Sequence, residues 1–241
     1  KSTSSEGGGV TVTFERDGKA ETISGSHLLV AVGRKANVDN LGLGTANIKH
    51  TPRGIDVNSG LRTSNQKVYA IGDCAGGLQF THVAGYHAGI VIRSALFRLP
   101  AKADHRAVPW VTYTDPELAQ VGLTETQARE RHGGSIRVLS GPYEDNDRAR
   151  VQRMTKGLVK AIVSKNGIIL GCGIAGPQAG ELIQVWVLAM SQGLKIGSIA
   201  SMVAPYPTLG EVSKRAAGSF YTTSLFSERT RKVVRFLSRF G

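Results

Sequence analysis

The fold is decided by the stretch Lys67-Val-Tyr-Ala-Ile-Gly-Asp-Cys-Ala-Gly76. A short apolar run that stops at a glycine is typical of a buried strand followed by a sharp turn. Gly72 allows close backbone approach where the strand ends, and Asp73 supplies a hydrogen-bond acceptor there. The run from Phe80 to Phe97 then indicates a helix. A strand, an acidic turn and a helix start predict a ligand site at the edge of an open α/β sheet.

An earlier stretch, Leu28-Leu-Val-Ala-Val-Gly-Arg34, repeats the apolar pattern and predicts a second strand that ends at Gly33. Between the two lies Leu61-Arg-Thr-Ser64. Taken alone, Asp73 could simply bond the backbone of its own turn, as Asp often does. The combination, however, resembles the FAD-domain signature of the pyridine nucleotide–disulfide oxidoreductases. This family contains dihydrolipoamide dehydrogenase, glutathione reductase and mercuric reductase, and the resemblance runs from about Val10 to about Leu225.

The resemblance implies that this region binds FAD. Asp73 would accept hydrogen bonds from the ribityl chain, and a helix would begin with its free N–H groups facing the pyrimidine edge of the flavin. Such a helix start suits a reduced flavin, because unpaired N–H groups and the helix dipole stabilise negative charge. The cofactor-binding residues implied by the resemblance are Gly33, Arg34, Gly72, Asp73, Thr81, His82, Val83 and Ala84.

Two histidines near the predicted helix start, His82 and His87, also allow a catalytic interpretation. Histidines in such positions are more often packing or surface residues, which is the alternative interpretation.

Length and composition are those of a protein with a substantial core. The chain has 241 residues, of which 41% are hydrophobic, enough for one large domain or two small ones. No run of eighteen apolar residues predicts a membrane span. Cys74 and Cys172 lie far apart in different motifs and predict no disulfide framework, so we expect a reducing, cytoplasmic location.

Domain boundaries follow from the resemblance. The family begins with a βαβ unit for FAD, a Cys-x4-Cys redox pair and a second unit for NAD(P), and none of these precedes Val10. We therefore expect the C-terminal part of a longer enzyme, with most NAD(P)H-binding residues outside this chain. The expected parts are a remnant of the nicotinamide-binding domain, the C-terminal part of the FAD-binding domain, a dimerisation domain and a basic tail: residues 1–35, 36–104, 105–227 and 228–241.

Local patterns support an α/β part followed by an α+β part. Gly7–Phe14 and the turn Asp17-Gly18 predict a hairpin. Thr124 and Gln127 predict a capped short helix that ends at the glycine pair 133–134. Further strands are expected at 54–57, 110–114, 119–122, 136–139, 157–164 and 167–173, and helices at 179–192 and 210–219, with a hairpin turn at 165–167. In the family, the second part forms a homodimer.

One motif is deceptive. Gly171-x-Gly173-x-x-Gly176 matches a dinucleotide-binding fingerprint in an apparent strand–turn–helix context. Pro177 falls where the helix should already run, and the residues about twenty positions on, around Lys195, offer no acid for a ribose. We interpret the segment as structural.

A second functional stretch is Ala204-Pro-Tyr-Pro-Thr-Leu-Gly-Glu211. Thr208 and Glu211 have the spacing of a helix capping box, which is the plainest interpretation. The family's disulfide reductases carry His-Pro-Thr-x-x-Glu here, and that His acts on the substrate thiol across the dimer. The resemblance implies that Tyr206 and Glu211 are the catalytic residues. A phenol is a poor proton acceptor at neutral pH, so ordinary disulfide reduction is in doubt.

Mercuric reductases are similar at this position, because they carry Tyr there, and they end in a vicinal cysteine pair. This chain ends Arg235-Phe-Leu-Ser-Arg-Phe-Gly241 and has no such pair, so we predict no metal site. The sequence departs from both subfamilies.

The final residues are strongly basic within a net charge of +12. On a helical wheel Val233, Phe236, Leu237 and Phe240 share one face, and the opposite face carries Arg231, Lys232, Arg235 and Arg239. This pattern is consistent with contact with an anionic membrane surface. The alternatives are a solvated terminus or a helix docked on its own domain, whereas nucleic-acid binding lacks a recognition fold.

Two function classes follow. The first is a flavin-dependent oxidoreductase that passes electrons from NAD(P)H to a small-molecule or protein disulfide, or to another soft acceptor. The second is a non-enzymatic dimerisation or binding module.

Overall fold

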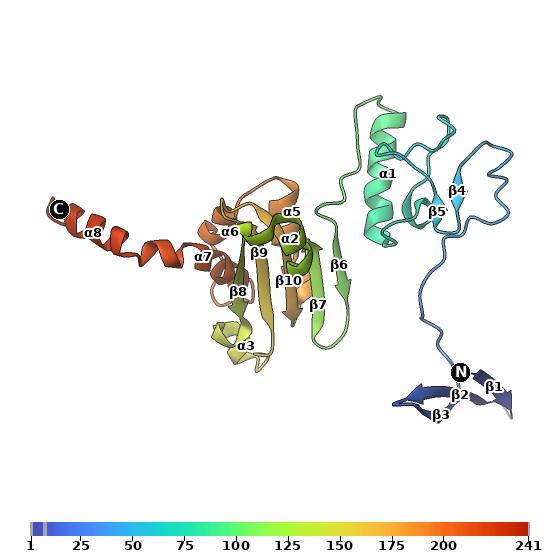
Figure 1. Cartoon of the computed structure of the whole chain (residues 1–241), viewed down its shortest axis with the longest axis horizontal. Coiled ribbons are helices and arrows are strands. Elements are labelled where there is room, and N and C mark those ends of the chain that lie inside the picture. Colours follow the sequence, from blue (N-terminus) through green and yellow to red (C-terminus); the bar gives the residue numbers. More distant parts are fainter. Residues whose placement is uncertain (1, 7–8, 241) are drawn as a thin grey trace.

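The computed structural model describes residues 2–6 and 9–240, which fall into three parts (Figure 1). The first is a small antiparallel sheet of β1 (Ser2–Glu6), β2 (Gly9–Arg16) and β3 (Lys19–Gly25), in that order. Its β2–β3 turn has positive φ at Asp17 and Gly18, which confirms the predicted hairpin. Gly7 and Gly8 of that prediction lie outside the described residues.

The second part surrounds the long helix α1 (Thr81–Ala95). It also contains the short pair β4 (His50–Thr51) and β5 (Gly54–Ile55) and the 3-10 turn η1 (Gly72–Ala75). Its small core consists of Ala36, Val38, Leu43, Ile48, Ile55 and Ala70. The predicted helix is therefore confirmed, although it ends at Ala95 instead of Phe97.

Two strand predictions in this region were wrong. Residues 28–32 form no strand, and the side chains of Leu29 and Val32 are 87% and 94% exposed. Around Tyr69 there is a single bridge, to Arg62, in place of a buried strand. A strand needs a neighbour to accept and donate its backbone hydrogen bonds. Within the described residues no neighbouring strand lies beside either segment, so apolar composition alone does not make a strand there.

The third part is a five-stranded antiparallel sheet in the order β6-β7-β10-β9-β8. Its strands are β6 (Pro109–Thr112), β7 (Glu117–Gly122), β8 (Ile136–Pro142), β9 (Leu158–Ser164) and β10 (Ile169–Gly176). All five were expected, and the turn between β9 and β10 has positive φ at Gly167, as a tight hairpin requires. β10 lies between β7 and β9, so the Gly171–Gly176 motif forms an interior antiparallel strand.

Helices cover both faces of this sheet (Figure 1). α2 (Glu125–His132) begins at the predicted capping box of Thr124 and Gln127 and packs on one face with Ile136 and Ile162. The expected helix 179–192 is split at Ile183 into two helices. The expected helix 210–219 extends further than predicted, to Leu225. The remaining elements are η2 (Gly133–Ser135), η3 (Tyr143–Asp145), α3 (Asp147–Val151), α4 (Ala179–Leu182), α5 (Gln184–Ser191), α6 (Ile196–Ser201), α7 (Glu211–Leu225) and α8 (Glu228–Leu237).

The main core lies between the sheet and the helices α5 and α7. Trp186 of α5 is fully buried in it, and its indole Nε1 donates to Ser213 Oγ of α7 at 3.0 Å. Cys172 is also buried, and burial raises the pKa of its thiol. None of the described helices is long and apolar enough to cross a membrane.

The Trp186–Ser213 bond should contribute measurably to stability. Ser213→Ala removes the only oxygen that accepts from the buried indole N–H, so we expect unfolding free energy to fall by about 1–3 kcal/mol. Denaturant titration of the chain followed by tryptophan fluorescence measures the loss. Ser191→Ala, at an exposed serine of α5, is the matched control and should change stability by less than about 0.5 kcal/mol. Equal effects of the two substitutions would contradict this role.

Candidate functional site

The turn at Gly72 packs directly on the first turns of α1. Gly72 has φ +64°, and a Cβ there would come within 2.9 Å of the Cβ of Ala84. On the other side, a Cβ at Gly54 would lie 2.5 Å from the backbone nitrogen of Gly76. Only glycine fits at both positions. The absence of side chains there lets the backbones of β5, η1 and α1 pack closely together.

Asp73 follows this turn and is exposed. Within the described residues its carboxylate takes part in no hydrogen bond or ion pair, and Gly76 N–H instead bonds the backbone oxygen of Asp73. The alternative interpretation, in which the side chain bonds its own turn, is therefore not the arrangement in this structure. The carboxylate is available to accept a hydrogen bond from an external hydroxyl group.

The start of α1 follows Asp73 by eight residues in the chain and presents free N–H donors. Phe80 is the N-cap and provides no side-chain cap, and the first turn contains no acidic residue. Val83 N–H and Ala84 N–H bond the Phe80 oxygen at 3.0 and 3.1 Å. In the described part of the chain, the N–H groups of Thr81 and His82 find no acceptor. This end of the helix can therefore bind the edge of a ligand that carries negative charge or carbonyl oxygens.

Arg34 connects the Leu28–Arg34 stretch to the same region. Its guanidinium Nη1 donates to the Gln79 oxygen at 2.7 Å, two residues before α1 begins. Gly33 precedes it with φ +134° and open space around it. The structure thus brings the expected Gly33–Arg34 pair beside the Gly72–Ala84 segment.

The two histidines have packing partners. His82 Nε2 donates to the Pro109 oxygen at 2.8 Å, and its ring stacks on Phe80. His87 is buried, and its Nδ1 accepts from Gly72 N–H at 3.1 Å. Since Nδ1 accepts, the neutral ring carries its proton on Nε2, which lies 2.8 Å from His105 Nε2. Sequence reasoning missed this His87–Gly72 contact because the partners are fifteen residues apart.

Burial and the nearby His105 lower the pKa of His87 below its usual value. Protonation of Nδ1 would replace its acceptor lone pair with a donor and would break the bond from Gly72 N–H. The geometry therefore favours the neutral imidazole.

Tyr206 and Glu211 belong to the sheet-containing part. Glu211 is the first residue of α7, which lies away from α1 (Figure 1), and Tyr206 precedes it by five residues. The exposed Tyr206 hydroxyl donates to Asp147 Oδ2 at 3.0 Å, and this bond raises the pKa of Tyr206. Glu211 Oε2 accepts from Thr208 N–H at 3.3 Å. The Thr208 hydroxyl, however, donates to the Pro205 oxygen at 2.7 Å, so only half of the predicted capping box forms.

Asp147 was not expected to take part in this site. It is the first residue of α3, whose N-cap is the buried Asn146, and Asn146 Nδ2 also donates to the Thr208 oxygen at 3.0 Å. An Asn-Asp pair before a short charged segment is the only sequence signal that marks this helix start. A cavity of about 340 Å³ adjoins it, lined by Arg148, Gln152, Gln178, Leu182 and residues 207–210.

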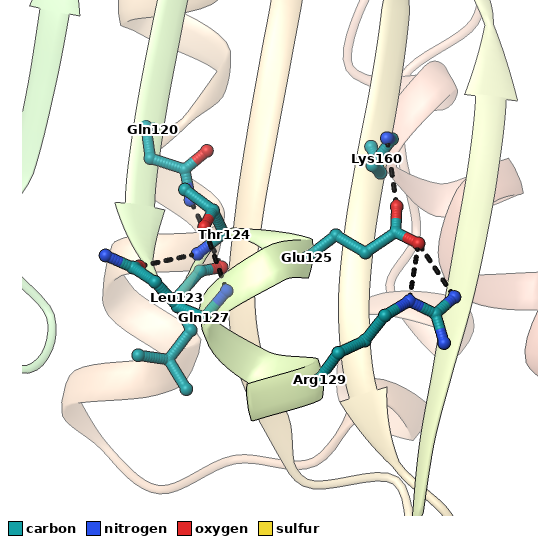
Figure 2. Close-up of polar contacts among 7 residues, drawn as sticks. All are labelled: Gln120, Leu123, Thr124, Glu125, Gln127, Arg129 and Lys160. Carbon is teal, nitrogen blue, oxygen red and sulfur yellow. Dashed lines mark hydrogen bonds and ion pairs between the residues drawn. The ribbon is translucent and has the colours of Figure 1, made fainter. Parts of the chain in front are cut away.

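A second polar cluster lies on the face of the sheet that α2 covers (Figure 2). Glu125 accepts from Arg129 Nη2 at 2.7 Å and from Lys160 Nζ at 3.1 Å, which lowers the pKa of Glu125. These residues line a cavity of about 350 Å³ together with Gln120 and Thr124. Because the carboxylate is matched by two cations, the cluster ties α2 to β9 and leaves no free acid for catalysis.

The residues around Gly72 fit a flavin better than a metal ion. Nowhere in the described residues do three or more His, Cys, Asp or Glu side chains gather as metal ligands would. The free Asp73 carboxylate suits a polyhydroxyl chain, and the uncapped start of α1 suits the acceptor-rich edge of a flavin ring.

Comparisons with known proteins identify the family of the chain. The family profile described as pyridine nucleotide-disulphide oxidoreductase matches residues 2–88, and the profile for its dimerisation domain matches residues 108–217. A dihydrolipoyl dehydrogenase of Geobacillus stearothermophilus is 40% identical over 211 residues, which cover 87% of this chain and 44% of that protein. A mercuric reductase of Staphylococcus aureus is 38% identical over 89% of this chain and 39% of its own.

A solved structure is similar as well. The crystal structure of LpdA from Mycobacterium tuberculosis superposes with a TM-score of 0.81 at 30% identity, covering 90% of this chain and 47% of that one. The chain thus spans less than half the length of each of these relatives. With an α/β part that carries the Gly72 turn and an α+β part that matches the dimerisation profile, the chain belongs to the pyridine nucleotide–disulphide oxidoreductase family.

Proposed function

We propose that this chain is the C-terminal part of an FAD-dependent oxidoreductase that takes electrons from NAD(P)H. The observation that carries the proposal is the free Asp73 carboxylate beside the uncapped start of α1. The acceptor is a disulfide, on a small molecule or a protein, or another soft group. The redox cysteine pair and most of the NAD(P)H-binding residues then belong to the remainder of the enzyme.

The exposed segment 28–32 supports this division. Side chains such as Leu29 and Val32 are apolar yet exposed, which is the condition of a strand without its neighbours. We propose that residues 1–35 end the nicotinamide-binding domain, that 36–104 end the FAD-binding domain, and that 105–227 form the dimerisation domain. Neighbouring strands of the longer enzyme then cover residues 28–32.

FAD, when bound, supplies the two-electron chemistry between the nicotinamide and the acceptor. In this chain Asp73 would accept hydrogen bonds from the ribityl hydroxyls, and Gly72, whose turn packs against Ala84, would keep Asp73 close to the start of α1. The segment 81–84 would face the pyrimidine edge with the free N–H groups of Thr81 and His82, and Gly33 and Arg34 would lie beside it. The free Asp73 carboxylate and the free N–H groups of Thr81 and His82 support these contacts.

Tyr206 and Glu211 are proposed to meet the acceptor across a homodimer. The pKa of Tyr206 is raised by its bond to Asp147, so the phenol stays protonated at neutral pH. It can donate a hydrogen bond but cannot serve as the general base that a histidine would be. This favours an acceptor other than an ordinary dithiol. Mercuric ion is the second candidate, because the mercuric reductase of Staphylococcus aureus is 38% identical to this chain.

A non-enzymatic role is the alternative for the chain by itself, as a dimerisation or binding module. Bound flavin in the intact protein distinguishes the two classes. Cys74 and Cys172 are both free thiols, which fits a cytoplasmic enzyme. We further propose that this enzyme touches a membrane surface through its basic tail and binds no nucleic acid.

Removal of the Asp73 carboxylate should weaken flavin binding. Asp73→Ala in the intact enzyme leaves ribityl hydroxyls without an acceptor, a loss of about 1–3 kcal/mol, so flavin should dissociate on dilution. Flavin absorbance after gel filtration measures retention. Glu130→Ala removes an exposed carboxylate from α2 and should retain flavin fully. Equal flavin retention in both variants would show that Asp73 does not bind the flavin and only belongs to the turn.

Replacement of His87 should loosen the turn that carries Asp73. His87→Ala leaves the buried Gly72 N–H without an acceptor, and we expect a loss of about 1–3 kcal/mol in stability together with faster flavin release. His87→Gln keeps an acceptor oxygen and should restore much of both. Circular dichroism melting and flavin release rates are the measurements. If the Gln variant were no better than Ala, the hydrogen bond would not be the cause.

The lowered pKa of His87 also predicts a pH dependence. The folded state binds this proton less readily than the unfolded state, so the contribution of His87 is fully present above its usual pKa of 6.5. It is lost as the pH falls below that value toward the folded pKa. Melting temperature measured from neutral to mildly acidic pH should therefore fall more steeply in the parent than in His87→Gln. Parallel curves would contradict this assignment.

The phenol of Tyr206 should affect only one half-reaction. Tyr206→Phe in the intact dimer removes the hydroxyl that donates to Asp147, so reoxidation of the enzyme by its acceptor should slow by about tenfold or more. Flavin reduction by NAD(P)H should be unchanged. Stopped-flow absorbance follows the two steps separately. Tyr113→Phe changes another exposed tyrosine and serves as the control, and unchanged acceptor turnover in both variants would remove Tyr206 from the site.

A further inference from the structure

The helix α8 has an apolar face that the described residues 2–6 and 9–240 leave exposed. It projects beyond the sheet-containing part at the C-terminal end (Figure 1). Its residues Val233, Val234, Phe236 and Leu237 are 50%, 58%, 58% and 59% exposed, and Phe240 just after it is 76% exposed. The rings of Phe236 and Phe240 pack edge to face with centroids 5.2 Å apart. Together these side chains form a continuous apolar strip along one side of the helix.

The opposite side of α8 is cationic. Glu228 is the one acidic residue of the segment 228–240, and it pairs with Arg231 at 3.3 Å. Lys232, Arg235 and Arg239 meet no carboxylate among the described residues. Arg229 likewise has no acidic partner there, and its spacing of four residues from Val233 and seven from Phe236 places it at the N-terminal end of the apolar strip. The helix thus combines exposed apolar side chains with unneutralised positive charge.

We propose that α8 is a membrane-surface helix that lies in the interface of a bilayer containing anionic phospholipids. The apolar strip inserts at the boundary between headgroups and acyl chains, and the cationic side contacts lipid phosphates. This inference specifies the partner of the tail contact proposed above. It does not depend on flavin binding. The membrane proposal can therefore fail while the oxidoreductase proposal stands, and the oxidoreductase proposal can fail while the membrane proposal stands.

Other occupants fit the helix less well. A second copy of the chain would bring another net charge of +12 to an already cationic helix. The dimerisation profile ends at residue 217, before α8 begins, so the helix lies outside the part that matches the family's dimer-forming domain. Nucleic acid would neutralise the charges but would leave the apolar strip exposed to water. A bilayer with anionic lipids satisfies both sides at once.

Vesicle flotation of the full chain tests the proposal. We expect the chain to float with phosphatidylcholine vesicles that contain about 30% phosphatidylglycerol, and to stay at the bottom with pure phosphatidylcholine. High salt should reduce the bound fraction, because it screens the cationic side. Failure to float with the anionic vesicles would overturn the proposal.

Two pairs of variants distinguish binding through α8 from nonspecific attraction between the net positive charge of the chain and the vesicle. Replacement of Arg231, Lys232, Arg235 and Arg239 by Gln should weaken partitioning by several hundredfold, at roughly fivefold for each of the four charges. The control replaces four exposed cations elsewhere by Gln: Lys102, Arg131, Lys165 and Lys195. The control should bind nearly as tightly as the parent. Equal weakening by both sets would overturn the proposal in favour of nonspecific charge attraction.

The apolar side is tested in the same assay. Leu237→Glu places a charge in the middle of the apolar strip and should reduce binding at least tenfold. Leu96→Glu introduces the same charge at a position that is 72% exposed just after α1, and it should bind as the parent does. If Leu237→Glu bound anionic vesicles as well as Leu96→Glu, insertion of the strip would be excluded and the proposal overturned.

Discussion

The hydrogen bond from Gly72 N–H to His87 Nδ1 is the constraint on which the candidate cofactor site depends. It fixes a turn of positive φ against the second turn of α1, and it does so inside the protein, where an unpaired N–H would be costly. Asp73 is one residue from this bond, and the free N–H groups of α1 begin eight residues later. This bond holds the turn against α1. The Asp73 carboxylate and the free N–H groups at the start of α1 therefore keep the same positions relative to each other.

The same imidazole reaches toward the second half of the chain. His87 Nε2 lies 2.8 Å from His105, and His82 donates to Pro109 where β6 begins. These contacts join α1 to the segment that leads into the five-stranded sheet. The sheet itself is secured independently, by the buried Trp186 and its bond to Ser213. The chain therefore has one part that carries the candidate ligand-binding groups and one part with a large core of its own.

Much of this could be predicted from the sequence where local chemistry decides the structure. The capping box at Thr124, the hairpin turn at Gly167 and the period of the long helix each follow from neighbouring residues. Residues 28–32 were predicted to be a strand and are not, because a strand also needs a neighbour that local pattern cannot supply. The His87–Gly72 and Tyr206–Asp147 contacts escaped prediction because they join residues far apart in the chain. The half-formed capping box shows that Thr208 had a nearer acceptor in Pro205.

The central claim is that Asp73 and the start of α1 bind one flavin. A crystal structure of the intact enzyme with FAD tests it most directly. We expect a ribityl hydroxyl within about 3 Å of the Asp73 carboxylate, and the pyrimidine edge of the ring facing the start of segment 81–84, where the N–H groups of Thr81 and His82 are free. A flavin bound elsewhere, with Asp73 turned back to its own backbone or left in solvent, would contradict it.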